Sequence, residues 1–404
     1  MALDLYHWKS YAAYKVKPRK EIHVNKLEGP RLETYQAARA AEWDKWLSFD
    51  AAEVLPAALL EKTMTKHGIN SVTPMRWVDV DKNESLRVPG TDTADIPEKP
   101  KSRLCVRGDR EQTIEDMRTD SPTASIYAFN LVCAWAASHR ARLFSGDAPS
   151  AYLQQDNDGR YMICTQPPGG IPGVPSGDYL LVKVRAYGSK DAGRSWYHTV
   201  QRRMAECSEK GRWVESSYEK AFYRFIDEDG KVKGAMITHV DDFLVTGFGA
   251  NYEQSIAKLA MLMSIEQWHS SSFRYCGKEV HQDDDFTITV EQSTNSADVP
   301  KISLTADQRR NPEKRLDGKT LFEVRNRLGR LSWLARKLPT GLGLWRQLRP
   351  GPRRARHLRQ RAGHQQDDHH LQGERQPRPR VQGRPDRLGA RAHHLVYRRQ
   401  PRQV

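Results

Sequence analysis

One short stretch, residues 235–247, constrains the fold more than any other part of this 404-residue chain. It reads Ala-Met-Ile-Thr-His-Val-Asp-Asp-Phe-Leu-Val-Thr-Gly, with Asp241 and Asp242 between two apolar runs that contain β-branched residues. This pattern predicts a tight β-hairpin that holds two acids at its turn. Adjacent carboxylates repel each other, so the turn is either a solvated corner or a site where a hard divalent cation offsets the charge.

The basic charge of the chain is concentrated at its C-terminal end. The net charge is +15, and residues 341–404, with 16 arginines, no lysine and 4 acidic residues, contribute +12 of it. This segment has few aromatic or β-branched residues, which predicts disorder. Two explanations stay open: a tail that binds nucleic acid by neutralising phosphates, or the out-of-frame translation of a GC-rich gene, which the abrupt use of Arg without Lys favours.

The cysteine pattern and the hydropathy of the chain indicate where in the cell the protein is expected. The five cysteines are scattered without a Cys-x-x-Cys pair, which favours a reduced, intracellular protein. No apolar run approaches the roughly 20 residues of a membrane span, and the first residues do not resemble a signal peptide. We therefore expect no membrane association.

Hydrophobic periodicity predicts an α+β fold. We expect an apolar, buried helix that starts at Ser121-Pro122, and a basic return strand whose charged residues include Lys101 and Arg103. The further expected helices cover residues 31–49, 194–204, 251–264 and 321–334. The expected strands cover residues 76–80, 103–106, 141–144 and 179–184, with an edge strand over 286–290.

A third acid, Asp147, follows the strand expected over residues 141–144. If one sheet brings Asp147 beside Asp241 and Asp242, the three carboxylates could hold two Mg²⁺ ions. One ion would lower the pKa of an attacking hydroxyl, and the other would neutralise a leaving pyrophosphate. Nucleotide polymerisation needs this arrangement.

Six segments between residues 101 and 335 form an ordered set of motifs. They are Lys-Ser-Arg-Leu-Cys-Val-Arg-Gly (101–108), Asp-Ala-Pro-Ser-Ala-Tyr-Leu (147–153), Tyr-Met-Ile-Cys-Thr-Gln-Pro-Pro-Gly (161–169), Tyr-Gly-Ser-Lys-Asp-Ala-Gly-Arg-Ser-Trp-Tyr (187–197), His-Val-Asp-Asp (239–242) and Leu-Gly-Arg-Leu-Ser-Trp-Leu-Ala (328–335). In order and spacing they resemble the motifs of copia-type retrotransposon reverse transcriptases, the RNA-dependent DNA polymerase domain of a Pol polyprotein.

The resemblance implies a right-hand polymerase fold with fingers and palm subdomains and an antiparallel palm sheet packed on helices. It implies an N-terminal arm over residues 1–30 and a reverse transcriptase domain over 31–340, with fingers over about 31–140 and palm and partial thumb over about 141–340; the tail over 341–404 follows. The protein would be an RNA-directed DNA polymerase, a nucleotidyltransferase that adds dNTPs to a primer on an RNA or DNA template. Its cofactor would be two Mg²⁺ ions, or Mn²⁺, and its partners other parts of a retrotransposon polyprotein, in a cytoplasmic virus-like particle or the nucleus.

The resemblance also implies residue roles. Asp147, Asp241 and Asp242 would be the catalytic metal carboxylates. Tyr152 would be a steric gate against the ribose 2′-hydroxyl, although an aromatic residue here could simply pack the palm. The other expected substrate contacts are Lys101 and Arg103 to the triphosphate, and Tyr187, Gly188 and Lys190 along the nucleotide pocket and template, with Gly188 allowing close backbone approach.

The chain departs from the family pattern at a few positions. His239 stands where the family has Tyr, and Gly193 where it has Pro. Asp191, in place of Gln, is expected to bring negative charge to the template path and weaken phosphate contact. None of these changes removes a metal ligand, but they leave room for an alternative: a degenerate or repurposed copy that keeps the fold and binds nucleic acid without catalysis, or with weakened activity. Another two-metal phosphodiester enzyme, such as a nuclease, would need neither the motif at 101–108 nor the Tyr-Gly-Ser-Lys stretch at 187–190.

Overall fold

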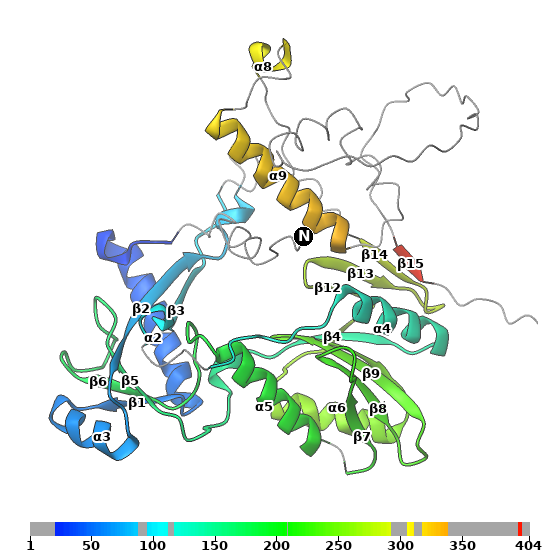
Figure 1. Ribbon diagram of the computed structural model, residues 1–404, viewed down its shortest axis with the longest axis horizontal. Coiled ribbons are helices and arrows are strands. Elements are labelled where there is room, and N and C mark those ends of the chain that lie inside the picture. The colour runs from blue at the N-terminus through cyan, green and yellow to red at the C-terminus, as the bar shows by residue number, and fades with distance from the viewer. Residues whose placement is uncertain are drawn as a thin grey trace, which may run out of the picture.

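The computed structural model describes residues 21–87, 95–111, 117–207, 209–291, 305–310, 317–337 and 395–397. Within these residues the fold is mixed α/β with three sheets (Figure 1), and their one parallel strand pair is β2 with β5. The expected combination of antiparallel sheets and helices is therefore confirmed. Most of the arm expected over residues 1–30, and nearly all of the tail expected over 341–404, lies outside the described residues.

The first sheet has five strands and is built from the N-terminal part of the chain together with residues 162–182. Its order is β1 (Ala52–Leu55), β6 (Tyr179–Val182), β5 (Met162–Thr165), β2 (Val72–Asp81) and β3 (Pro100–Val106). The strands expected over residues 76–80 and 103–106 are confirmed as β2 and β3, and they pair antiparallel with Arg76 opposite Cys105. Buried side chains alternate along β2, as expected for a strand with one face in the core.

Helix α2 (Gly29–Ser48) packs on β3. Its Trp43 and Trp46 lie in one core with Trp77 and Leu104. The shorter helix α3 (Leu60–His67) follows β1 in the chain.

A buried ion pair fixes α2 on the hairpin. Arg39 donates to Asp79 over 2.6 Å from Nη2 to Oδ2, and Ser102 Oγ donates to the other oxygen of Asp79 over 2.7 Å. The guanidinium of Arg39 also lies 5.1 Å from the ring centre of Trp77. A buried pair is stabilising only when its remaining hydrogen-bonding capacity is met, as it is for Asp79 here.

The second sheet has six antiparallel strands and contains the predicted Asp-Asp hairpin. Its order is β11 (His269–Ser270), β4 (Leu143–Asp147), β10 (Asp242–Gly247), β9 (Val232–His239), β8 (Phe222–Ile226) and β7 (Arg212–Glu215). Helix α4 (Ile126–His139) covers one face, and α5 (Ala192–Glu206) and α6 (Ala250–Leu262) cover the other (Figure 1). Side chains of β10 alternate accordingly: Leu244 packs in the α4 core, and Phe243 and Val245 in the opposite core.

A third sheet packs against α4 from its other side. Its order is β12 (Ser272–Tyr275), β13 (Lys278–Gln282), β14 (Ile288–Glu291) and β15 (Leu395–Tyr397). Val280, Ile288 and Val290 share a buried cluster with α4. The edge position expected for residues 286–290 is wrong, because β14 pairs with β13 and with β15.

Two further expectations for α4 are wrong. The helix begins at Ile126, with Ser125 as N-cap accepting from Ala128 N over 3.3 Å, and not at Ser121-Pro122. It is also not buried all round, because the two sheets leave one side open, where Tyr127 is 80% and Leu131 53% exposed.

The remaining described elements are short or lie near the end of the domain. The predicted C-terminal helix is confirmed as α9 (Gly318–Lys337), which α8 (Ala306–Arg310) precedes. Short 3₁₀ turns are η1 (Val24–Lys26), η2 (Ala57–Leu59), η3 (Glu84–Leu86), η4 (Gly108–Arg110) and η5 (Ala151–Leu153). Among the described helices, none has the length and hydropathy needed to cross a membrane.

Candidate active site

The Asp-Asp hairpin has a strained turn that other elements hold in place. Val240 and Asp241 join β9 to β10, and Val240 has φ of 59°, a left-handed conformation that is unfavourable for a β-branched residue. Trp196 Nε1 of α5 donates to the Val240 carbonyl over 2.8 Å, and Ala148 N donates to the Asp241 carbonyl over 2.8 Å. Helix α5 and the chain after β4 therefore both anchor this turn.

The sheet brings the third acid to the hairpin. Asp147, the last residue of β4, is the direct register partner of Asp242 in β10. Residues directly opposite on antiparallel strands point to the same face, with Cβ atoms about 4.5–5.5 Å apart. The expected meeting of Asp147 with the Asp-Asp pair is thus a consequence of strand pairing.

The three carboxylates form a repulsive cluster. Burial and the charge of Asp241 raise the pKa of Asp242 from 3.8 to about 6, although a contact from Cys276 opposes part of this shift. Burial and Asp241 also raise the pKa of Asp147, against the charges of Lys101 and Lys82, which lower it. The cluster is therefore short of positive charge.

The donor set suits a hard divalent cation. All three side chains offer carboxylate oxygens, the ligands that Mg²⁺ and Mn²⁺ prefer, and a cation between them would relieve the repulsion that raises both pKa values. The residues present fit the ions that the sequence implies.

Two of the predicted cations lie on strand β3. Lys101 and Arg103 are two residues apart on β3, so they share one face of the strand. Lys101 is half-buried; burial and the neighbouring Arg103 lower its pKa to about 8. The charge of Lys101 acts on Asp147, and that of Arg103 on Tyr152, which links β3 electrostatically to the acids.

Two tyrosines connect the cores of the first and second sheets. Tyr152 packs against the core of the six-stranded sheet and Tyr187 against that of the five-stranded sheet. Their ring centres are 5.4 Å apart with planes 70° apart, and the Arg103 guanidinium lies 5.2 Å from the centre of Tyr187. Burial raises the pKa of Tyr187 to about 12, so this phenol stays neutral.

The loop after Tyr187 approaches β3 closely. Gly188 has φ of 90°, and a Cβ there would lie 2.0 Å from the carbonyl oxygen of Val106. Val106 N donates to Tyr187 O over 2.7 Å. The absence of a side chain at Gly188 therefore lets the loop approach the backbone of β3 closely. Lys190, further along the loop, is exposed, and its charge acts on Glu111.

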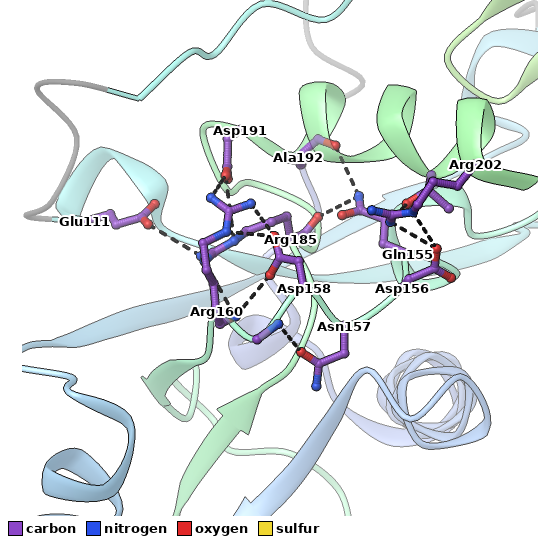
Figure 2. A network of polar contacts seen from close by, with 12 residues as sticks. Glu111, Gln155, Asp156, Asn157, Asp158, Arg160, Arg185, Asp191, Ala192 and Arg202 are labelled. Atoms are coloured by element: carbon purple, nitrogen blue, oxygen red, sulfur yellow. Dashed lines mark hydrogen bonds and ion pairs between the residues drawn. The ribbon is translucent and has the colours of Figure 1, made fainter.

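The expectation for Asp191 is wrong. Its side chain is 3% exposed and faces two arginines, with Oδ2 2.9 Å from Arg160 Nη1 and 3.7 Å from Arg185 Nε (Figure 2). Arg185 is itself buried and lies 3.9 Å from Glu111. The carboxylate of Asp191 is therefore neutralised inside the protein and does not repel a template.

The other substitution in this segment, Gly193, has a steric explanation. A Cβ at Gly193 would lie 2.5 Å from both Cβ and Oγ of Ser121, so the larger residue typical of the family would displace Ser121.

Sequence reasoning missed three residues at the site. Lys82, just after β2, acts on both Asp147 and Lys101 through its charge. Trp196 belongs to a recognised motif, but its indole contact with the hairpin turn had no local signal. Cys276 lies 34 residues beyond Asp242 in the chain, and its Sγ is 3.5 Å from Oδ2 of that acid.

Comparison with known proteins identifies the family. Residues 70–309, more than half of the chain, match the family described as reverse transcriptase (RNA-dependent DNA polymerase). The chain therefore belongs to the reverse transcriptase family. No curated protein matches its sequence.

One solved structure that matches the chain has a distant likeness to it. The foamy viral protease-reverse transcriptase dRH in complex with ds DNA shares 10% identity at a TM-score of 0.29, over 68% of this chain and 38% of that one. This chain thus spans less than half of that protein, and we draw nothing further from the likeness.

Proposed function

We propose that this chain is an RNA-directed DNA polymerase of a copia-type retrotransposon. The observation that carries the proposal is the register pairing of Asp147 with Asp242 beside the Asp241 turn, in a chain of the reverse transcriptase family. In this proposal the fingers cover about residues 31–140, and the palm and partial thumb cover about residues 141–340. The six-stranded sheet is the palm sheet, and the five-stranded sheet joins β1, β2 and β3 of the fingers to β5 and β6 from the later segment.

The chain's own groups supply binding and positioning. When bound, two Mg²⁺ ions would lower the pKa of the primer hydroxyl and neutralise the leaving pyrophosphate. Asp147, Asp241 and Asp242 would hold these ions, because strand pairing and the anchored turn fix their positions before binding.

Substrate contacts follow from the strand and ring geometry. Lys101 and Arg103 project from one face of β3, where their charges would attract a triphosphate. Tyr152 would meet the sugar and reject a 2′-hydroxyl, held edge-on by Tyr187. Gly188 would set the loop close to β3, and Lys190, exposed beyond it, would contact the template backbone.

The proposed partners are a primer on an RNA or DNA template, dNTPs, and other parts of a retrotransposon polyprotein. The proposed location is a cytoplasmic virus-like particle or the nucleus. The rival function is a copy that binds nucleic acid without synthesis, which the replacement of the family Tyr by His239 favours.

Primer extension separates the two functions. The full chain is incubated with a labelled DNA primer on an RNA template, dNTPs and Mg²⁺, alongside Asp241→Asn. We expect extension by the wild type and at least about a 1,000-fold loss in the variant, because one of three fixed metal ligands is gone. Duplex binding without extension by the intact chain would support the rival and exclude the polymerase.

A further inference from the structure

Two hairpin turns from different sheets meet at Asp242. His239 is the register partner of Asp242 across the β9–β10 turn. Cys276 lies in the two-residue turn between β12 and β13, where both Cys276 and Gly277 have positive φ. The Cys276 thiol contacts Oδ2 of Asp242 over 3.5 Å.

The ligand atoms of these three residues form a compact mixed set. A ring nitrogen of His239, a carboxylate oxygen of Asp242 and Sγ of Cys276 all lie within 4.8 Å of one another. Each residue is half-buried, so a metal ion could reach the group from solvent. The set shares Asp242 with the acid cluster but is otherwise separate from it.

Nitrogen, oxygen and sulfur donors together select a softer metal than the acid cluster does. Zn²⁺ is bound at about 2.0–2.2 Å by imidazole or carboxylate and at about 2.3 Å by thiolate, usually with four ligands. Donor atoms within 4.8 Å of one another need to close by only about 1 Å to reach such a tetrahedron. Mg²⁺ prefers oxygen ligands and would gain nothing from the thiol or the imidazole.

We propose that this chain binds one Zn²⁺ ion through His239, Asp242 and Cys276, with water in the fourth position. Binding forms a zinc–sulfur bond and releases the thiol proton to the buffer. The family's Tyr at position 239 lacks the ring nitrogen, so the site depends on a substitution that this chain carries.

A functional consequence rests on the proposed polymerase function. Zinc held by Asp242 withdraws one of the three carboxylates from the Mg²⁺ ligands. Zn²⁺ therefore inhibits nucleotide addition at a concentration set by this site, and the inhibition depends on Cys276.

Cobalt spectroscopy tests the binding itself. The reduced full-length chain is titrated with Co²⁺ alone, and the near-ultraviolet thiolate-to-cobalt band and the visible bands of tetrahedral Co²⁺ are recorded; Zn²⁺ is then added. We expect one equivalent to give both sets of bands and Zn²⁺ to remove them. The thiolate band also distinguishes this site from binding by histidine pairs alone, such as His369-His370 and His393-His394.

Matched variants locate the site. Cys276→Ser is expected to lose the thiolate band, and both Cys276→Ser and His239→Tyr are expected to weaken Co²⁺ binding at least about 10- to 100-fold, the loss found even for outer-shell partners of metal ligands. Cys105→Ser is the control, because Cys105 is a half-buried thiol on β3, in the five-stranded sheet, and is not one of the three proposed ligands. A wild type without the band, or a band that survives Cys276→Ser or disappears with Cys105→Ser, overturns the proposal. Circular dichroism shows whether each variant folds. If Cys276→Ser or His239→Tyr does not fold, Co²⁺ binding by the other of these two variants tests the proposal.

Primer extension with and without Zn²⁺ at fixed Mg²⁺ tests the consequence. Each protein is compared with its own zinc-free rate. We expect inhibition of the wild type and of Cys105→Ser, and at least about a 10-fold higher inhibitory concentration for Cys276→Ser. If the cobalt bands appear but none of the proteins extends the primer, the proposed polymerase function is excluded and the proposed zinc site is still supported.

Discussion

Replacing Asp242 by Asn should make the metal-free protein more stable. In the fold, burial and Asp241 raise the pKa of Asp242 from 3.8 to about 6. That difference corresponds to about 3 kcal/mol of disfavoured ionisation. Because the side chain is partly exposed, solvent screening lowers this value, and we expect Asp242→Asn to raise the free energy of unfolding by about 1–2 kcal/mol above pH 7.

The gain in stability from Asp242→Asn should decrease as the pH falls. The folded protein binds more protons than the unfolded chain between the two pKa values of Asp242, so the wild type gains stability as the pH falls through about 6 towards 4. Below about pH 4, Asp242 is protonated in both the folded and the unfolded state, so it no longer destabilises the folded protein. The advantage of Asp242→Asn should therefore shrink to near zero between about pH 6 and pH 4.

Urea unfolding in a chelating buffer measures this effect across the pH range. Asp229→Asn is the control, because the backbone amide of Lys231 lowers the pKa of Asp229 at an exposed turn. That variant should lose stability at neutral pH, and its loss should fade on acidification. Added Mg²⁺ should stabilise the wild type more than Asp242→Asn. Equal or lower stability of metal-free Asp242→Asn above pH 7 would refute the repulsive cluster.

Three further predictions follow from the loop and the strand beside the site. Gly188→Ala should lower the free energy of unfolding by about 2–4 kcal/mol, because the left-handed conformation and the steric clash both oppose a Cβ; a urea midpoint equal to that of the wild type would contradict this. Asp191→Gln should lower the free energy of unfolding by about 3 kcal/mol, because buried Arg185 loses one of its acidic partners. Asp156→Asn, which removes a half-exposed ion pair, should lower it by less than about 1 kcal/mol. Similar losses in the two variants would argue against a buried ion pair at Asp191. The affinity for dNTP should fall above about pH 8, because Lys101 loses its proton there. Lys101→Arg should remove that fall, because arginine stays charged. Identical pH profiles of KM for the wild type and Lys101→Arg would exclude Lys101 as the phosphate contact.

The central hairpin could be predicted because its information is local. Short apolar runs with β-branched residues lie on both sides of Asp241 and Asp242, and these runs alone identify two strands and a turn. The pairing of Asp147 with Asp242 is not local: the order of the strands in the sheet sets it, and only the motif resemblance indicated it. Strands such as β5 and β7, of four residues each, are too short for a periodic signal.

The wrong expectations share a physical cause. Asp191 is buried because it pairs with Arg160, 31 residues earlier, and with Arg185. The negative charge of Asp191 alone carries no information about these partners, so the sequence wrongly predicted that it faces the template. Helix α4 is apolar nearly all round in sequence, yet two sheets can cover only part of a cylinder, and Tyr127 stays exposed. The contact of Cys276 with Asp242 joins two turns of different sheets, for which a single sequence carries no signal.

Manganese binding tests most directly the claim that three carboxylates form one metal site. The full chain is mixed with a primer–template that ends in a dideoxynucleotide and with the matching dNTP, and Mn²⁺ is titrated by electron paramagnetic resonance. We predict two bound Mn²⁺ ions per chain for the wild type and at most one, or weaker binding by at least about 10-fold, for Asp147→Asn, Asp241→Asn and Asp242→Asn. Equal Mn²⁺ binding by the wild type and all three variants would contradict the account.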